Sequence, residues 1–232
     1  MSESPSDNNQ PDRNPPDLKK KDRSRVRRQH NRGHYDRETV DTLLDAALIG
    51  HIAYVIDDAP YCTPTLVWRG DDHVYWHGSS ISRFLQQVEG RQACVTVTHF
   101  DGLVLARSAF HHSANYRSVM LFGEVEVVTG ETKERALVDF MEGILPGRWD
   151  SLRTMTRKEL NATTVLRMPI DEGAAKIRTG PPADDKKDYE LPIWAGVVPF
   201  ELRPVGIEPD PANLPDVRVP DEVAVFAAER DV

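Results

Sequence analysis

The chain has 232 residues, of which 39% are hydrophobic and 28% charged, and its formal net charge is −8. An acidic chain lacks the overall positive potential that a general nucleic-acid-binding protein needs. No apolar run is long enough to span a membrane or resembles a signal peptide, and two cysteines do not make a disulfide framework. We therefore expect a cytoplasmic protein that has neither membrane nor nucleic acid as a partner.

The two ends of the chain differ from its interior. Residues 1–34 lack apolar periodicity, and the stretch 19–37 holds nine Lys or Arg against two Asp, a net charge of +7. Residues 205–232 hold seven acidic residues against two arginines, a net charge of −5. Such segments cannot bury enough apolar surface to offset the entropy lost on ordering. We expect a disordered basic arm over 1–34, a domain over 35–204 and an acidic, proline-rich tail over 205–232.

The domain is predicted to begin with a helix and a strand. Apolar residues recur at helical spacing from Val40 to Leu48, with Asp36 as the N-cap. Gly50 is expected to end this helix, because glycine is common just beyond helix C-termini. The alternating run 51–57 then predicts a strand.

Short strands and turns dominate the next part of the domain. The run 61–70 predicts a strand that contains Pro64, which a sheet tolerates only at an edge or an irregular place. A hairpin turn at 70–72 leads into the strand 73–78, and a short helix over 81–90 follows. Asp101-Gly102 is a typical hairpin dipeptide and is expected to join two buried strands.

The rest of the domain is predicted to contain mainly strands. The expected elements are a strand at 118–130, a helix at 132–145, a mixed segment at 156–170, and strands at 174–180 and 194–206. Parallel βαβ units would place a helix after each strand, and the sequence does not show this alternation. The sequence therefore predicts a mainly β fold, an antiparallel β-barrel with peripheral helices, because closure removes exposed edges.

Polar residues gather where the strand 73–78 ends, in the stretch HGSSISR. Ser80, Ser82 and Arg83 offer hydroxyl and guanidinium donors, and a helix expected to begin near Ser80 would add free backbone N–H groups. This set suits a phosphate group. The alternative interpretation is an N-cap serine beside a surface arginine.

A second polar stretch, 109–118, is longer than a plain hairpin needs. His111 and His112 are neighbours, so at most one of them faces a given pocket on an extended chain. No CxxC, HExxH, GxSxG, P-loop or GxGxxG motif supports a metal site, a hydrolase or a nucleotide fold. Further along, Lys176 and Arg178 share one face of a predicted strand, and Trp194 suits either packing at the barrel mouth or stacking on a flat ligand.

The stretches YWHGSSISRFL, ACVTVTHFDGLVLARSAFHHSANYRSVMLFG and KIRTGPPADDKKDYELPIWAGVVP occur in one order within residues 35–204. In this combination the chain resembles the pyridoxamine 5′-phosphate oxidase-like family of flavin-binding split barrels, in particular its flavin-nucleotide-binding and nitroimidazole-resistance-protein branch. The resemblance implies a six-stranded antiparallel split barrel of Greek-key type, a homodimer, and FMN at the subunit interface.

The resemblance also implies site residues. Pro64 and Thr65 would contact the isoalloxazine ring through their backbone, while His77, Ser80, Ser82 and Arg83 would surround the ribityl chain and phosphate. Further implied contacts with the flavin or substrate are Thr96, Thr98, Asn115, Tyr116, Arg117 and Trp194, the last from the partner chain. The substrate-binding arginine and histidine of the true oxidase have no match here, so activity on pyridoxamine phosphate is not expected.

We therefore expect a flavin-dependent oxidoreductase that reduces a small organic acceptor, with a reduced nicotinamide as one candidate electron donor. Arg107, Arg117 and Lys176 are candidates for a cation that stabilises the reduced flavin. His77 or His112 is a candidate proton donor, and each has a structural role as its alternative. Two other interpretations remain: a module that binds flavin, deazaflavin or haem without turnover, with an FHHS histidine as haem ligand, and a scaffold that acts through its charged arms.

Overall fold

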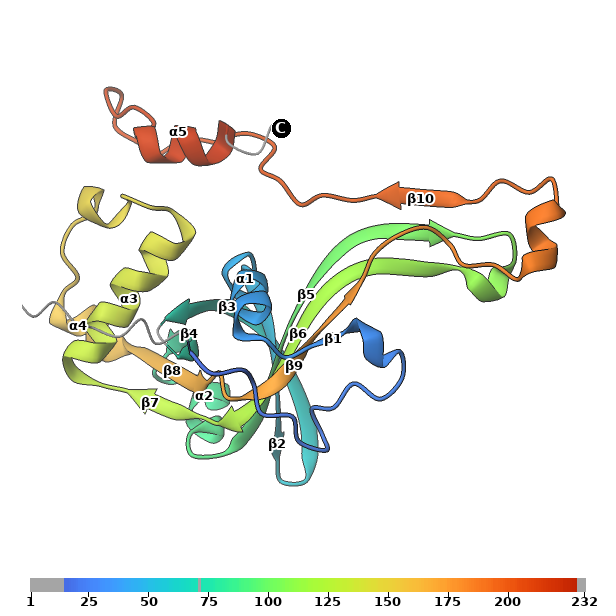
Figure 1. Cartoon of the computed structure of the whole chain (residues 1–232). Helices are drawn as coiled ribbons and strands as arrows, with labels where there is room; N and C mark the ends of the chain where they lie inside the picture. The colour runs from blue at the N-terminus through green and yellow to red at the C-terminus, as the bar shows by residue number, and fades with distance from the viewer. Residues whose placement is uncertain (1–14, 71, 229–232) are drawn as a thin grey trace, which may run out of the picture.

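The computed structural model describes residues 15–70 and 72–228, and most of its strands coil into an antiparallel barrel (Figure 1). The strands are β1 (Gly33–His34), β2 (Ile49–Ile56), β3 (Ala59–Gly70), β4 (His73–Ser79), β5 (Gln92–Leu105), β6 (Ser113–Glu124), β7 (Glu126–Val128), β8 (Thr163–Pro169), β9 (Glu172–Arg178) and β10 (Gly196–Pro199). Their order in the sheet is β1-β9-β6-β5-β2-β3-β4-β8-β7, and β10 pairs with β5. The mainly antiparallel β fold predicted from the sequence is confirmed.

Helices cover the barrel from outside. They are α1 (Arg37–Asp45), α2 (Arg83–Val88), α3 (Gly130–Ile144), α4 (Arg157–Ala162) and α5 (Asp221–Ala228), with short 3-10 helices η1 (His30–Arg32), η2 (Ala109–His111), η3 (Trp149–Ser151) and η4 (Lys186–Glu190). Helix α1 begins where the sequence predicts, because the Asp36 carboxylate accepts a hydrogen bond from the Thr39 backbone N–H at 2.9 Å.

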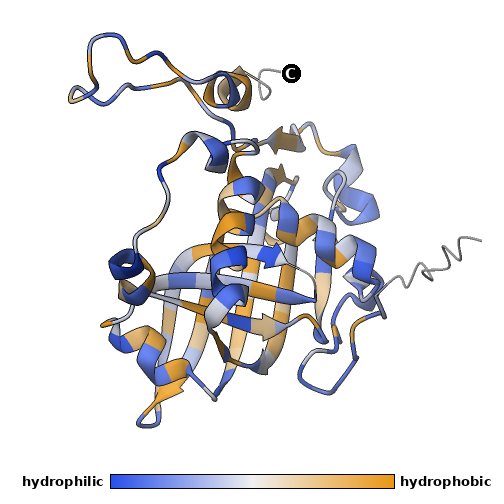
Figure 2. Ribbon diagram, turned by 90° about the vertical axis from the view of Figure 1, so that its left-hand side faces the viewer, coloured by the Kyte–Doolittle hydropathy of each residue, from blue (hydrophilic) through white to orange (hydrophobic). Residues whose placement is uncertain are grey.

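Two apolar clusters hold these elements together. The larger cluster fills the barrel and joins side chains of α1, such as Leu43, to strand residues such as Ile52. The smaller one lies under α3, where Phe140 packs on Trp68. Strand β4 serves both, since Trp76 belongs to the first cluster and its neighbour Tyr75 to the second. Figure 2 shows the apolar residues concentrated on the strands of the barrel.

The described part of the basic N-terminal arm, residues 15–34, differs from the expected disordered segment, while residues 1–14 lie outside the described residues. Leu18 is 4% exposed within the barrel cluster, and β1 pairs with β9. Lys21 and Arg23 form ion pairs of 2.9 and 2.7 Å with Glu172, a carboxylate on β9. By its composition this segment cannot bury enough apolar surface alone, but the barrel provides it with an apolar surface and β9 with a buried acid, Glu172.

Two turn predictions are wrong, and both concern glycines. Gly50 does not end α1 but lies in β2, where a Cβ atom would approach Val67 Cγ1 to 2.6 Å. Asp101-Gly102 does not form a hairpin, because β5 runs through it with a bulge. A Cβ atom on Gly102 would lie 2.9 Å from the Val198 carbonyl oxygen of β10. In both places glycine permits the close approach of neighbouring chain segments.

Strands β5, β6 and β9 continue beyond the barrel as a twisted ribbon, and β10 lies along β5 (Figure 1). The chain then runs outside the barrel to α5. Glu222 of α5 accepts hydrogen bonds from Ser151 Oγ at 2.9 Å and from Arg148 Nη1 at 3.4 Å. Within residues 15–70 and 72–228, no helix combines the length and the apolar character needed to cross a membrane.

Candidate functional site

The outer face of the barrel carries a row of residues from three strands. His51 of β2 lies directly opposite Pro64 of β3 on one side and Thr96 of β5 on the other. Residues that pair directly in an antiparallel ladder point to the same face, so these side chains lie next to one another. A second row continues this face, from Thr98 of β5 through β6 to Lys176 of β9.

This outer face, which we call the open face, is apolar around its polar row. Three apolar side chains next to the polar row are exposed: Ile49 (47%), Leu66 (38%) and Met120 (45%). Ile49 and Leu66 pair with each other, and Met120 pairs with Thr96. Pro64 fits here because β3 pairs with β4 only from Val67 onward, which leaves an edge that needs no N–H donor. Thr65 points to the other side of β3, so only its backbone borders the open face.

The turn between β4 and α2 leaves its donors available. Helix α2 begins at Arg83 and not near Ser80 as predicted, and Ser82 is its N-cap without a side-chain cap hydrogen bond. The turn is held by its backbone, since the Ser80 N–H donates to the Ala162 carbonyl at 2.8 Å. Among the described residues, neither serine hydroxyl has a hydrogen-bond partner, and the exposed Arg83 has no carboxylate partner. This donor set suits a phosphate group.

His77 does not join these donors. Its ring packs against Phe140, with 4.7 Å between ring centroids, and against Trp68 at 5.7 Å, in the cluster under α3. Burial lowers the pKa of His77, so the ring is neutral at pH 7. Its buried Nδ1 atom has no hydrogen-bond partner among the described residues. The structure thus places His77 in an apolar environment beneath a helix.

Other candidates from β5 and β6 are held by neighbouring side chains. Arg117 donates two hydrogen bonds to the Asp101 carboxylate, at 2.9 and 2.8 Å, which raises the pKa of Arg117. Arg107 pairs with Asp184 at 3.1 Å and stacks on a tyrosine ring. Tyr116 is half-buried on β6, opposite Arg178. The two arginines therefore already have carboxylate partners within the chain.

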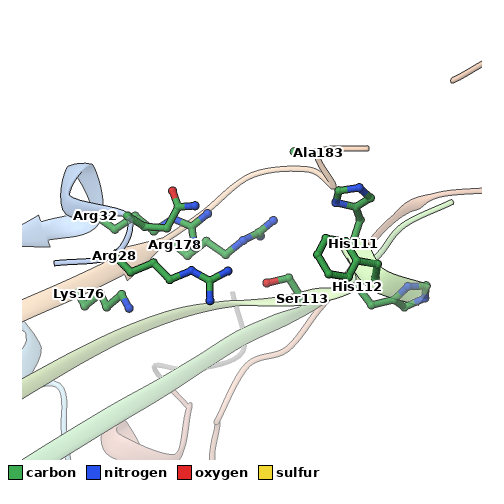
Figure 3. Close-up of a pocket in the computed structure, with 10 residues that line it drawn as sticks. Arg28, Arg32, His111, His112, Ser113, Lys176, Arg178 and Ala183 are labelled. Carbon is green, nitrogen blue, oxygen red and sulfur yellow. The ribbon is translucent and has the colours of Figure 1, made fainter. Parts of the chain in front are cut away.

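A pocket of about 570 Å³ lies between the basic N-terminal segment and the ribbon (Figure 3). We call it the cationic pocket, and it is lined by Arg28, Gln29, Arg32, Phe110, His111, His112, Ser113, Lys176, Arg178 and Ala183. Lys176 also ends the second row of the open face, so the pocket and the open face adjoin. No acidic side chain is part of this lining.

Arg178 is the most deeply buried cation of the pocket, with 7% of its surface exposed. Its guanidinium donates to the side-chain oxygen of Asn115 and, at 3.4 and 3.3 Å, to the carbonyls of Gly180 and Pro181. All three partners are uncharged. Burial and the nearby positive charge of Arg32 lower the pKa of Arg178. A buried cation without a counter-ion gives the pocket a positive potential, which favours an anionic group.

The other pocket cations are also unpaired with acids. Arg28, Arg32 and Lys176 form no ion pair with any described residue. His112, at the far end of the pocket, places Nδ1 2.8 Å from the Ser108 carbonyl oxygen. Because a carbonyl only accepts, Nδ1 carries the proton and Nε2 of the neutral ring keeps its lone pair. His111 instead lies 3.8 Å from Asp185.

Trp194 stands at the start of the chain segment that leads to β10. It is 67% exposed, and its ring covers Gly196, where a Cβ atom would come within 2.8 Å of Trp194 Cζ2. Its predicted contact with a flavin in a partner chain stays a prediction.

Sequence reasoning missed four residues of these surfaces. His51 looks like an ordinary strand residue in the sequence, and only the strand register places it between Pro64 and Thr96. Arg28 and Arg32 lie in a segment that its composition predicts to be disordered. Arg178 shares a strand face with Lys176, and the alternation of charged and apolar residues was the available signal for it.

The sequence and fold identify a family. A family model described as pyridoxamine 5′-phosphate oxidase matches residues 36–177. The chain therefore belongs to the flavin-binding pyridoxamine 5′-phosphate oxidase-like split-barrel family, as the sequence resemblance predicted. No curated protein matches the chain.

Two solved structures are similar to this chain over nearly their whole length. The flavocytochrome Anf3 from Azotobacter vinelandii is 45% identical with a TM-score of 0.85, covering 89% of this chain and 97% of that one. The FAD and haem binding protein from Mycobacterium smegmatis is 35% identical with a TM-score of 0.82, covering 84% and 97%. A 5-nitroimidazole antibiotic resistance protein from Bacteroides thetaiotaomicron, at 19% identity, TM-score 0.52 and coverage of 62% and 86%, shares the fold alone.

Proposed function

We propose that this chain is a redox protein that binds one flavin and one haem and acts as a flavin-dependent oxidoreductase. The observation that carries the proposal is the cationic pocket, in which unpaired cations and an imidazole with a free Nε2 line one cavity. This is the donor set that a haem needs, a nitrogen ligand for its iron and cations for its two propionates. The names of the two similar proteins, a flavocytochrome and a FAD and haem binding protein, support the same pair of groups.

The flavin is proposed to lie on the open face. Pro64 and the Thr65 backbone would border the ring, with Thr96 and Thr98 on the neighbouring strand. Ser80, Ser82 and Arg83 keep free donors for the phosphate. The sequence led us to expect FMN, whereas the FAD in the name of the mycobacterial protein favours the dinucleotide. The choice between them is part of the proposal.

The haem is proposed to lie in the cationic pocket. His112 would ligate the iron through Nε2, with the Ser108 carbonyl fixing the ring by its hydrogen bond to Nδ1. Arg28, Arg32 and Lys176 would pair with the propionates. This arrangement joins the flavin hypothesis to the haem hypothesis, which the sequence had offered only as alternatives.

A homodimer completes the proposal. The open face leaves apolar side chains such as Ile49, Leu66 and Met120 about half exposed, and a second copy would remove them from water. Bound flavin supplies two-electron chemistry and bound haem supplies one-electron chemistry. The chain would place the two groups side by side through Lys176, accept electrons from a reduced nicotinamide and pass them to a small acceptor.

The test replaces one histidine at a time. We expect His112→Ala to lose at least nine-tenths of the Soret absorbance while the flavin bands remain, because the variant removes the iron ligand and leaves the open face intact. His111→Ala is the matched control and should keep its haem. Haem content unchanged in His112→Ala would overturn the ligand assignment, and a wild-type protein that takes up flavin but no added haem would overturn the haem proposal.

A further inference from the structure

The residues after β10 form an extended segment, 200–228, which we call the C-terminal arm. Its first residue is fixed to the barrel, since the Phe200 N–H donates to the Asp101 carbonyl at 3.1 Å. Over 201–220 the described backbone hydrogen bonds connect residues of the arm only with one another. The arm is attached again through α5, where Glu222 binds Ser151 and Arg148. Between these two attachments it passes outside the barrel (Figure 1).

Large apolar side chains of the arm are exposed. Val205 is 95% exposed, Leu202 80% and Leu214 72%. Single exposed apolar residues are normal on a protein surface. Here they occupy a segment without strand or helix, and the described backbone hydrogen bonds of 201–220 stay within the arm. A segment that stays extended under these conditions is shaped to lie on another surface.

The same chain carries an apolar surface that its own arm leaves uncovered. The open face exposes Ile49 (47%), Val55 (52%) and Met120 (45%). Strand β10, which leads into the arm, belongs to the same sheet, yet the arm does not cover these side chains. At that base Phe200 packs edge-to-face on Phe100, with 5.0 Å between ring centroids. The exposed apolar surface therefore continues from the sheet onto the arm.

The C-terminal arm and the N-terminal segment carry opposite net charges. Residues 201–228 hold six acids against two arginines, a net charge of −4, and residues 15–32 hold eight Lys or Arg against two Asp, a net charge of +6. No ion pair joins these two segments among the described residues. Several cations of the N-terminal segment pair with acids of that segment, of β9 or directly before β9, but Lys20 and Arg25 form no ion pair with any described residue. These two cations remain available to the acidic arm of a second copy.

We propose that the C-terminal arm clasps a second copy of this chain, with Leu202, Val205 and Leu214 packed against that copy. This inference rests on the proposed homodimer and names the segment that holds it together. A two-fold axis places the arm of each copy on the other, so every arm contact occurs twice.

The experiment measures dimer dissociation constants by sedimentation equilibrium on the full chain and on two variants. The triple variant Leu202→Ser, Val205→Ser, Leu214→Ser changes only exposed positions, and a chain ending at residue 200 lacks all but the first residue of the arm. We expect both to dissociate at least 100-fold more readily than wild type, since burying one such side chain contributes about tenfold or more to an equilibrium. Leu191→Ser, at a residue 45% exposed outside the arm, the open face and the cationic pocket, is the matched control and should dimerise as wild type.

The outcomes separate the clasp from the dimer itself. A wild-type dimer whose dissociation constant is unchanged in the triple variant overturns the clasp and leaves the proposed homodimer standing. A wild-type chain that is monomeric at tens of micromolar overturns both.

Discussion

At the scale of single residues, Glu172 shows how a buried charge organises the basic N-terminal segment. Its carboxylate is 3% exposed, accepts two hydrogen bonds from Arg23 at 2.7 and 2.8 Å, and lies 2.9 Å from Lys21 Nζ. The Arg23 hydrogen bonds are the main cause that lowers the pKa of Glu172 from 4.5 to about 2. A depressed pKa means that the stabilisation is present at neutral pH and is lost as the pH falls from about 4.5 towards 2.

Glu172→Gln should therefore loosen residues 15–34 without unfolding the barrel. The variant removes charge-assisted hydrogen bonds that each contribute about 1–3 kcal/mol. The protection factors of this segment in amide hydrogen exchange at pH 7 should fall in the variant, and those of wild type should fall towards the variant's values as the pH approaches 2. Asp171→Asn, which removes the exposed neighbouring pair with Lys19, is the control and should change little. Equal protection in Glu172→Gln and wild type would refute this role.

At the scale of elements, the turn between β4 and α2 unites a strand end, free serine hydroxyls and Arg83. Arg83→Ala should weaken flavin binding at least tenfold, because a charge-assisted contact to a phosphate is lost. Equilibrium dialysis against FMN and FAD measures the effect. Arg91→Ala, an exposed arginine just beyond the other end of α2, should bind as wild type. An unchanged flavin affinity in Arg83→Ala would show that the flavin phosphate does not bind at this turn.

Elements were predictable where their cause is local. The Asp36 cap, the periodicity of α1 and the restriction that Pro64 places on β3 all depend on residues close in sequence. The reading of Asp101-Gly102 as a turn failed because β10, almost a hundred residues later, packs on that glycine. The packing of residues 15–34 and the positive charge of the cationic pocket likewise depend on β9. Contacts between distant segments decide these features, and no local pattern encodes them.

At the scale of the whole molecule, two binding surfaces share one sheet. The open face spans β2, β3, β5, β6 and β9, and the cationic pocket begins where β9 leaves the barrel, with Lys176 common to both. The resemblance implies residues of the first surface, whereas the second surface forms because the N-terminal segment packs against β9. A protein that brings a flavin next to a haem needs two adjoining sites of this kind.

The absorption spectrum of the purified full-length chain, recorded after incubation with FAD and haemin and removal of unbound ligand, tests the central claim most directly. We predict two flavin bands together with a sharp Soret band, and a shift of that Soret band when a reduced nicotinamide is added. A spectrum with flavin bands alone, or with no bound chromophore, would contradict the account.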